Sequence, residues 1–271
     1  MYVTVNTGGR LLYRYFGWGL DNTEVGHIRT AYRLGVVMVI LLLAVSAASV
    51  LVRQPRLDDG AQRALIYDPL YETQTAVGFT DTLEELLTGE GFRVEAYRGE
   101  EATVKQLQAL KGGYGLMVFR VHSGVFEDEV WLFTGEEFDA SRYVGMQLVN
   151  EVHVARSPND PRMFFAVGPR FVGSRLGGVS SGLIVLMGCD GLGDEGLAMA
   201  FHDAGADAVV GWSGAVFLSC SDEALIALIR GLLTGESLGD AVVSCSQVQG
   251  VSLLVYPTGS RDFSLGVTVT G

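Results

Sequence analysis

The feature that most constrains the fold is an uninterrupted apolar run, Gly182 to Met187, which ends in Gly188-Cys189-Asp190-Gly191. A short apolar run bounded by glycines is typical of a strand buried on both faces, as at the centre of a parallel sheet. In open α/β sheets, ligands and reacting groups lie just beyond the carboxyl ends of the strands. The sequence therefore predicts that Cys189 lies at a functional edge of the sheet. The structural alternative is one more buried cysteine.

The chain ahead of this run predicts alternating strands and helices. Strands are expected over 63–69, 92–97 and 116–121, and helices over 79–88 and 103–110. The order strand, helix, strand, helix, strand predicts a parallel sheet with right-handed crossovers.

The stretch between residue 121 and the central run is less regular. We expect a strand or hairpin arm over 129–136, a helix over 141–153 that includes His153, and a loop over 155–181 with a short apolar piece at 163–167. After Cys189 the expected elements are a helix at 194–204, a strand at 207–212, a helix at 221–233, and strands at 252–256 and 263–269. No internal repeat or clear linker follows residue 60, so we expect one α/β domain over 61–271 with a mostly parallel sheet.

Residues 35–52 form an 18-residue apolar stretch without a charge, proline, asparagine or glutamine. At ~1.5 Å per residue, a helix of this length approaches the thickness of a bilayer core. The 34 residues that precede it argue against a cleaved signal peptide. The expected organisation is an N-terminal juxtamembrane segment at 1–34, a single transmembrane helix at 35–52, a linker at 53–60 and the domain at 61–271.

The orientation of this span is not decided by charge, because arginines flank it on both sides. The short N-terminal tail and the linker lead us to expect the domain outside the cytoplasm. Residues 1–34 mix aromatic residues, leucine and arginine, which suits a segment at the membrane interface; a cytoplasmic tail is the alternative.

Charge divides at the same boundary. Residues 1–56 contain six arginines against Asp21 and Glu24, a net charge of +4. The total net charge is −12, so residues 57–271 carry a net charge of −16. A domain this acidic, with Lys105 and Lys111 as its only lysines, is a poor candidate for nucleic-acid binding.

The three cysteines (189, 220 and 245) form no CxxC motif and no paired spacing, so neither a zinc site nor a disulfide framework is expected. We expect no cofactor, and the oligomeric state stays open.

His122 follows the expected strand 116–121 as Cys189 follows its own strand. If those strands are parallel neighbours, both side chains lie at the same sheet edge. A cysteine nucleophile needs an imidazole within reach and backbone N–H groups for the oxyanion. Gly124, Gly188 and Gly191 would let a substrate backbone approach closely, and the N-terminus of the helix at 194–204 would favour a thiolate.

Three stretches carry a resemblance to a known family. They are a strand followed by His122-Ser123-Gly124, a strand followed by Gly188-Cys189-Asp190-Gly191, and the segment from Gly196 to Trp212 with its Ala-Gly-Ala. In order and spacing the chain resembles the caspase-like cysteine peptidases (clan CD), particularly the gingipain and CHAT-domain branches, over about residues 63–235.

The resemblance implies a three-layer αβα domain and cleavage of peptide bonds through an acyl-enzyme. His122 would act as general acid/base and Cys189 as nucleophile, with Ser123, Gly124 and Gly188 as backbone groups around the oxyanion. The expected partner is a peptide or protein substrate.

One departure from the family pattern is Ser123, because many members have glycine directly after the histidine. A catalytically inactive caspase-like binding or scaffold module at the membrane is therefore the alternative function. An acyl transferase that uses the same Cys–His pair is a third. Asp190, Trp212 and Asp222 are the candidate substrate-pocket residues, and the two carboxylates could accept a basic side chain.

Overall fold

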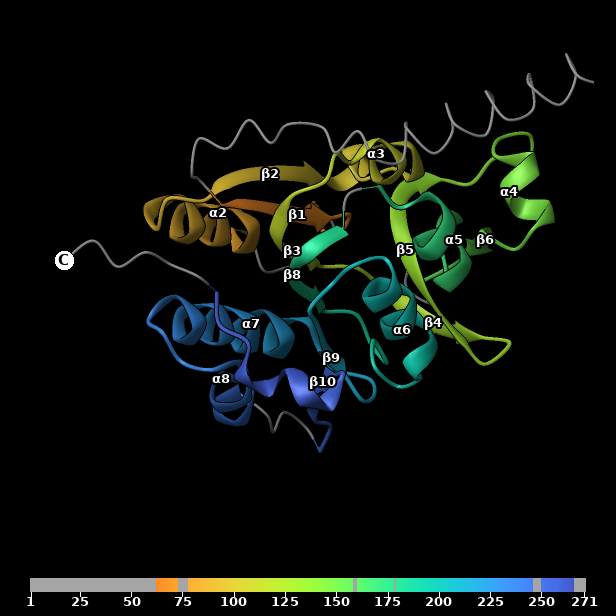
Figure 1. Ribbon diagram of the computed structural model, residues 1–271. Coiled ribbons are helices and arrows are strands. Elements are labelled where there is room, and N and C mark those ends of the chain that lie inside the picture. The colour runs from red at the N-terminus through yellow and green to blue at the C-terminus, as the bar shows by residue number, and fades with distance from the viewer. Residues whose placement is uncertain (1–61, 73–77, 158–159, 178, 246–249, 266–271) are drawn as a thin grey trace, which may run out of the picture. The chain divides into compact units, whose positions relative to one another are not determined.

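The computed structural model (Figure 1) describes residues 62–72, 78–157, 160–177, 179–245 and 250–265. The segment 1–34, the expected membrane span at 35–52 and the linker at 53–60 lie outside these described residues. Among the helices that are described, none has both the length and the apolar character needed to cross a bilayer.

The main sheet has six strands in the order β10-β9-β8-β3-β1-β2. Every neighbouring pair is parallel except β9 with β10, which is antiparallel. The predicted mostly parallel α/β arrangement is therefore confirmed. The strands are β1 (Arg63–Asp68), β2 (Arg93–Arg98), β3 (Tyr114–Phe119), β8 (Val179–Leu186), β9 (Ala208–Trp212) and β10 (Leu253–Tyr256).

The apolar run that contains Leu183 to Leu186 lies in β8, between β3 and β9. Successive side chains of a strand point to opposite faces. Leu183 and Val185 accordingly join one core cluster and Ile184 and Leu186 the other. All four are buried, which explains why this strand shows no polar alternation.

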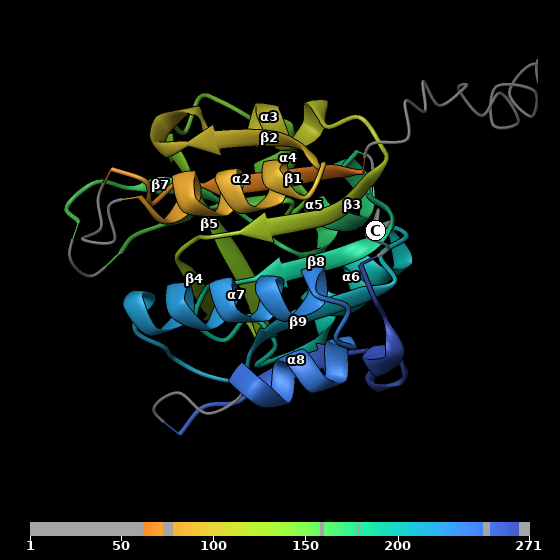
Figure 2. The same ribbon diagram turned by 90° about the vertical axis from the view of Figure 1, so that its left-hand side faces the viewer.

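Helices cover both faces of the main sheet. One face packs against α2 (Phe79–Gly89), α7 (Leu218–Leu233) and α8 (Leu238–Cys245), and Figure 2 looks onto these helices. The opposite face packs against α3 (Val104–Ala109), α5 (Pro169–Arg175) and α6 (Glu195–Asp203). Two short 3₁₀ turns, η1 (Gly99–Glu101) and η2 (Thr258–Asp262), complete this part of the chain.

A second, antiparallel sheet of four strands is inserted between β3 and β8, in the order β4-β5-β7-β6. In Figure 1 it lies to the right of the main sheet, on the side towards which β2 points. Its elements are β4 (Ser123–Phe126), β5 (Glu129–Glu137), α4 (Val144–Leu148), β6 (Val152–Ala155) and β7 (Phe164–Val167).

Within the insertion the strand expected over 129–136 is confirmed as β5, but the other elements expected there were wrong. The helix expected over 141–153 is reduced to α4, because Tyr143 and Asn150 have positive φ values of 52° and 57° at its two ends. His153 lies in β6, not in a helix, and is paired with Ala166 of β7. Alternating β-branched residues such as Val152 and Val154 fit a strand better than a helix.

The loop expected over 155–181 contains β7, α5 and the first residues of β8. Pro169 at the first position of α5 was the available signal for that helix. At the other end of the chain, residues 263–265 do not form the expected strand, and residues 266–269 lie outside the described residues. Leu265 is instead buried in the core on the α7–α8 side of the sheet.

Candidate active site

His122 and Cys189 lie at equivalent positions beyond two paired parallel strands. In the register of β3 and β8, Phe119 is the partner of Leu186, and each site residue follows three positions later. The N–H of Met187 extends the pairing by donating to the carbonyl of Phe119 over 2.9 Å. The prediction that both residues follow neighbouring strands at one sheet edge is confirmed.

A hydrogen bond joins the two strand ends directly. Ser123 Oγ donates to the carbonyl oxygen of Cys189 over 2.5 Å. Gly188 makes this approach sterically feasible, because a Cβ atom there would lie 2.1 Å from Ser123 Oγ and 3.0 Å from the carbonyl oxygen of Val121. Glycine is the residue that allows such close approach. The segments that carry His122 and Cys189 are therefore held together by the Ser123 side chain and by its close packing on Gly188.

Cys189 is half-buried, and its thiol donates a weak hydrogen bond to the carbonyl of Val216, with Sγ and oxygen 3.6 Å apart. The next residue, Asp190, has a φ of 56°, and its N–H donates to the carbonyl of Gly214 over 3.0 Å. These contacts attach the turn after β8 to the segment after β9, which fixes the position of the sulfur.

The contacts of α6 do not support a role for its N-terminus in stabilising a Cys189 thiolate. Asp194 is the N-cap residue, and its carboxylate accepts a hydrogen bond from the N–H of Gly196 over 2.9 Å. A carboxylate at this position already satisfies the positive end of the helix dipole.

His122 is half-buried, and its ring lies edge-on to Phe133 with the centroids 6.3 Å apart. Within the described residues, neither ring nitrogen makes a hydrogen bond, whether to the Cys189 thiol or to another group. Burial lowers the pKa of His122 below its ordinary 6.5, the positive charge of Arg120 lowers it further, and the carboxylate of Asp160 opposes both effects. The imidazole is therefore neutral at neutral pH and has its ring nitrogens available to a substrate or a thiol.

A buried ionic network lies beneath the site. Arg120, two residues before His122, donates to the carboxylate of Asp68 over 3.0 and 3.2 Å and to that of Asp222 over 2.8 and 2.9 Å. All three side chains are less than a tenth exposed. Asp68 also accepts a hydrogen bond from Thr80. The sequence signal was one arginine directly after the apolar run of β3, but nothing local identified its partners.

The residues expected to line a substrate pocket are not exposed together. Asp222 is 6% exposed and its carboxylate is bound by Arg120, so its charge is not available to a substrate. Trp212 is 2% exposed and its indole N–H donates to Ser221 Oγ over 2.8 Å. Asp190 is half-buried in the turn after Cys189. The expectation of a pocket built by Trp212 and Asp222 is not supported.

A cavity that the sequence did not predict lies on the other side of His122. It has a volume of about 170 Å³. It spans the carboxyl ends of β1, β2 and β3 and is closed by β5 and by Ser157, Asp160, Arg162 and Phe164. Its lining residues are Pro69, Leu70, Glu72, Gly99, Glu100, His122, Phe133, Thr134, Gly135, Ser157, Asp160, Arg162 and Phe164. Glu100 lies in the 3₁₀ turn η1, directly after the strand β2, so its place at this sheet edge could have been inferred from the sequence.

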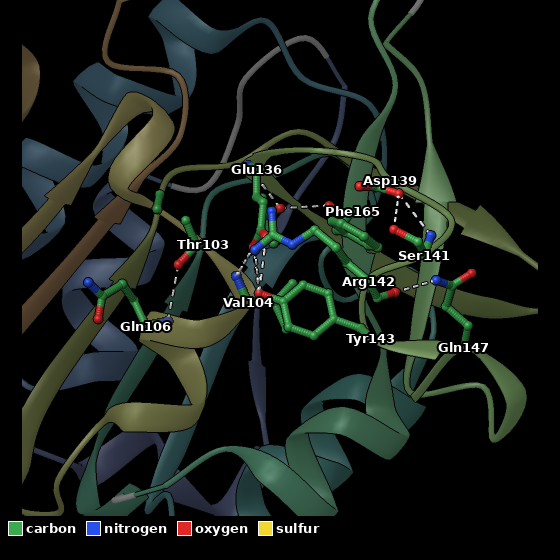
Figure 3. A network of polar contacts seen from close by, with 12 residues as sticks. Thr103, Val104, Gln106, Glu136, Asp139, Ser141, Arg142, Tyr143, Gln147 and Phe165 are labelled. Atoms are coloured by element: carbon green, nitrogen blue, oxygen red, sulfur yellow. Dashed lines mark hydrogen bonds and ion pairs between the residues drawn. The ribbon is translucent and has the colours of Figure 1, made fainter. Parts of the chain in front are cut away.

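The wall that β5 contributes to this cavity is fixed by close backbone packing. The N–H of Gly135 donates to the carbonyl of Ala102 over 2.8 Å, and a Cβ at Gly135 would lie 1.9 Å from the carbonyl oxygen of Gly99. One residue later, the buried carboxylate of Glu136 accepts a hydrogen bond from the N–H of Val104 over 3.0 Å. Figure 3 shows this carboxylate between the start of α3 and the side chains of Arg142 and Tyr143. The second sheet is thus attached to the main domain beside the cavity.

No disulfide joins the three cysteines, all of which belong to the described residues. Nor do the described residues contain a group of three or more histidine, cysteine, aspartate or glutamate side chains placed to hold a metal ion. No protein-family model matches this chain, and no curated protein sequence matches it either. The strongest chemical feature of the described chain is the pair of His122 and Cys189.

Proposed function

We propose that this chain is a membrane-anchored cysteine endopeptidase of the caspase-like type, with a three-layer αβα domain. The observation that carries the proposal is the position of His122 and Cys189. Each lies three residues after one member of the pair Phe119 and Leu186, which are partners in the parallel strands β3 and β8. Helices on both faces of the mostly parallel sheet agree with the proposed fold. A half-buried thiol and a neutral imidazole at one sheet edge are the groups that thiol catalysis needs.

In the proposed reaction, His122 accepts the proton of the Cys189 thiol, and the sulfur attacks the carbonyl carbon of the scissile peptide bond. For this step the imidazole must turn from Phe133 towards the sulfur, and the thiol must leave the carbonyl of Val216. Backbone N–H groups around Ser123, Gly124 and Gly188 are the candidates to hold the oxyanion of the tetrahedral intermediate.

The intermediate collapses when protonated His122 gives its proton to the leaving amine. This breaks the C–N bond and leaves an acyl group on Cys189 as a thioester. His122 then removes a proton from a water molecule, whose oxygen attacks the thioester carbon. The acid product leaves, and the thiol is restored when His122 returns the proton to sulfur.

The test uses the full chain and a library of internally quenched peptides. Cys189→Ala and His122→Ala should each abolish most cleavage, because nucleophile and base act as a unit and their losses are not additive. Cys220→Ala and Cys245→Ala are matched controls and should retain parental rates. Cleavage by Cys189→Ala at the parental rate would falsify the assignment of the nucleophile.

A thiol-reactive fluorescent probe separates the enzyme from the inactive binding module. Reaction that depends on both Cys189 and His122 supports catalysis. If Cys189 reacts no faster than Cys220 or Cys245 and no peptide is cleaved, the chain is a caspase-like module without peptidase activity.

The proposal keeps residues 35–52 as the membrane anchor, with the domain outside the cytoplasm. Protease added to intact cells should then digest the domain. Complete protection, with digestion only after the membrane is permeabilised, would place the domain on the cytoplasmic side.

A further inference from the structure

We propose that an exposed apolar face at α4 lies on the lipid bilayer and holds the domain against the membrane. This surface, the α4 face, consists of Val144 and Leu148 of the helix and Val149 directly after it. The inference rests on the membrane anchor of the proposed function, and it does not depend on the peptidase reaction.

The segment that carries α4 exposes its apolar side chains. Leu148 is 80% exposed, and Val144 and Val149 are each 49% exposed. No residue of α4 is buried, and Figure 1 shows the helix at the outer margin of the second sheet. Val144 and Leu148 are four positions apart, so they lie on the same side of the helix. This side of α4 is therefore open to a contact outside the domain.

The other side of the same segment is attached to the domain. Figure 3 shows Arg142 and Tyr143 directed at the buried carboxylate of Glu136. The Tyr143 hydroxyl lies 3.0 and 3.1 Å from the two oxygens of this carboxylate. One turn later, the sulfur of Met146 accepts a hydrogen bond from the Gln108 side chain over 3.7 Å. These contacts decide which side of α4 faces outwards, and that side is the apolar one.

The charge of this segment also favours a lipid surface. Residues 140–150 contain one arginine and no acidic residue, although residues 57–271 carry a net charge of −16. The flanking carboxylates of Asp139 and Glu151 accept hydrogen bonds within the domain. Tyrosine and arginine beside an apolar surface are typical of the membrane interface. This stretch can therefore approach a bilayer that would repel most of the acidic domain.

The length of the chain between the anchor and the domain permits this contact. The proposed transmembrane helix ends at residue 52 and β1 begins at Arg63, so the connection spans at most about 40 Å at ~3.6 Å per residue. Arg63 donates to the carbonyl of Lys111 over 3.1 Å, just beyond the end of α3. Gln108, near the same end of α3, contacts Met146 of α4. The start of β1 is thus linked to α4 through one end of α3, within reach of the bilayer surface.

The attachment to the membrane makes so small a face effective. Membrane affinity grows with the apolar area that is buried, so three side chains would bind a detached domain only weakly. A short linker to the same bilayer raises the effective concentration to about the millimolar range. The α4 face would then fix the orientation of the domain, and with it the distance of His122 and Cys189 from the bilayer.

The experiment uses the full chain in phosphatidylcholine nanodiscs, with an environment-sensitive fluorophore on a single cysteine. Alanine replaces the native thiols of Cys189, Cys220 and Cys245. Gly145→Cys carries the label on α4, where nothing lies within 4 Å of a Cβ. We expect a blue-shifted emission that nitroxide lipids quench, because an interfacial helix lies about 5–10 Å into the headgroup region. A label at Val243→Cys, an exposed position of α8, is the control and should keep the emission of a label in water.

The α4 face is tested by removing its apolar side chains. Val144→Ser/Leu148→Ser should abolish the quenching of the label at residue 145. The matched control, Met199→Ser/Leu254→Ser, changes two other exposed apolar residues and should keep the quenching. Because all four side chains are exposed, both variants should unfold at the midpoint temperature of the parent. Quenching that persists in Val144→Ser/Leu148→Ser would overturn the role of the α4 face.

Alkaline extraction of the membranes tests the anchor separately. A chain that resists extraction but carries an unquenched label at residue 145 keeps its anchor and has no lipid contact at α4. A blue shift that nitroxide lipids do not quench means that protein, such as a second copy of the chain, covers the α4 face, and this also overturns the lipid contact. Release of the chain by alkali overturns the anchor, and the tethered contact fails with it.

Discussion

Arg120 and Asp222 are 102 residues apart in the sequence, yet they form a two-point ion pair, with Nε 2.8 Å and Nη2 2.9 Å from the two carboxylate oxygens. The same guanidinium also binds Asp68, so one buried cation serves two buried carboxylates. Burial raises the pKa of Asp222 above its ordinary 3.8, while the hydrogen bonds and charge of Arg120 act in the opposite direction. This network ties the end of β3, and with it His122, to β1 and α7.

Replacing the shared cation should be costly. Arg120→Met leaves two buried carboxylates without a counter-charge, and breaking a buried pair in this way costs about 3–5 kcal/mol of unfolding free energy. Chemical denaturation measures the loss. The control is Arg98→Met, because Arg98 pairs with Asp81 and Glu84 at a partly exposed site. That change should cost about 1 kcal/mol or less. Equal losses in the two variants would contradict a structural role for the network.

The lowered pKa of His122 makes stability depend on pH in a defined direction. Since the folded pKa lies below the unfolded value of about 6.5, the unfolded chain binds more protons between these two values. The free energy of unfolding contributed by His122 is therefore fully present above pH 6.5 and is lost as the pH falls through the folded pKa. His122→Asn should lack this part of the dependence.

Nuclear magnetic resonance titration of the His122 ring gives the folded pKa directly. Asp160→Asn removes the carboxylate that raises this pKa and should lower it further. A His122 pKa above 6.5 in the parent chain would contradict the burial of the ring.

The close packing of Gly188 on Ser123 predicts a coupled pair of mutations. Gly188→Ala places a methyl carbon 2.1 Å from Ser123 Oγ and 2.8 Å from its Cβ, so it should displace the turn that carries His122 and cost about 1–3 kcal/mol. Ser123→Gly removes both clashing atoms. Thermal unfolding of the two single variants and the double variant should reveal strong non-additivity, with the double variant recovering part of the loss. Additive losses of unfolding free energy would show that the two residues are not in steric contact.

Gly135→Ala should disturb the cavity wall. Its Cβ would lie 1.9 Å from the carbonyl oxygen of Gly99, which forces β5 away from η1. We expect a loss of at least about 1–3 kcal/mol. Gly173→Ala is the matched control, because nothing lies within 4 Å of a Cβ at this position in α5. That change should be neutral or stabilise the chain by up to about 1 kcal/mol. A denaturation midpoint for Gly135→Ala equal to that of the parent would contradict the close approach.

The local sequence was sufficient to predict the central strand and the placement of His122 and Cys189 at one edge of the sheet. The apolar run before Gly188 indicated burial on both faces, and the alternation of strands and helices indicated a mostly parallel sheet. The positions of His122 and Cys189 beyond their strands followed from these two patterns. Burial, turns and strand ends depend on a few consecutive residues, so they can be predicted from the sequence.

The tertiary structure alone decided which distant residues meet. Val152 and Val154 lie in a strand that pairs with β7, although we expected a helix over this segment from the residues before it. Arg120 acquired Asp222 as a partner, and Glu100 came to lie in a cavity with His122, through strand order and long-range packing. A single sequence specifies the burial preference of each residue, but the partner of a buried charge and the shape of a cavity depend on how separate segments fit together in space.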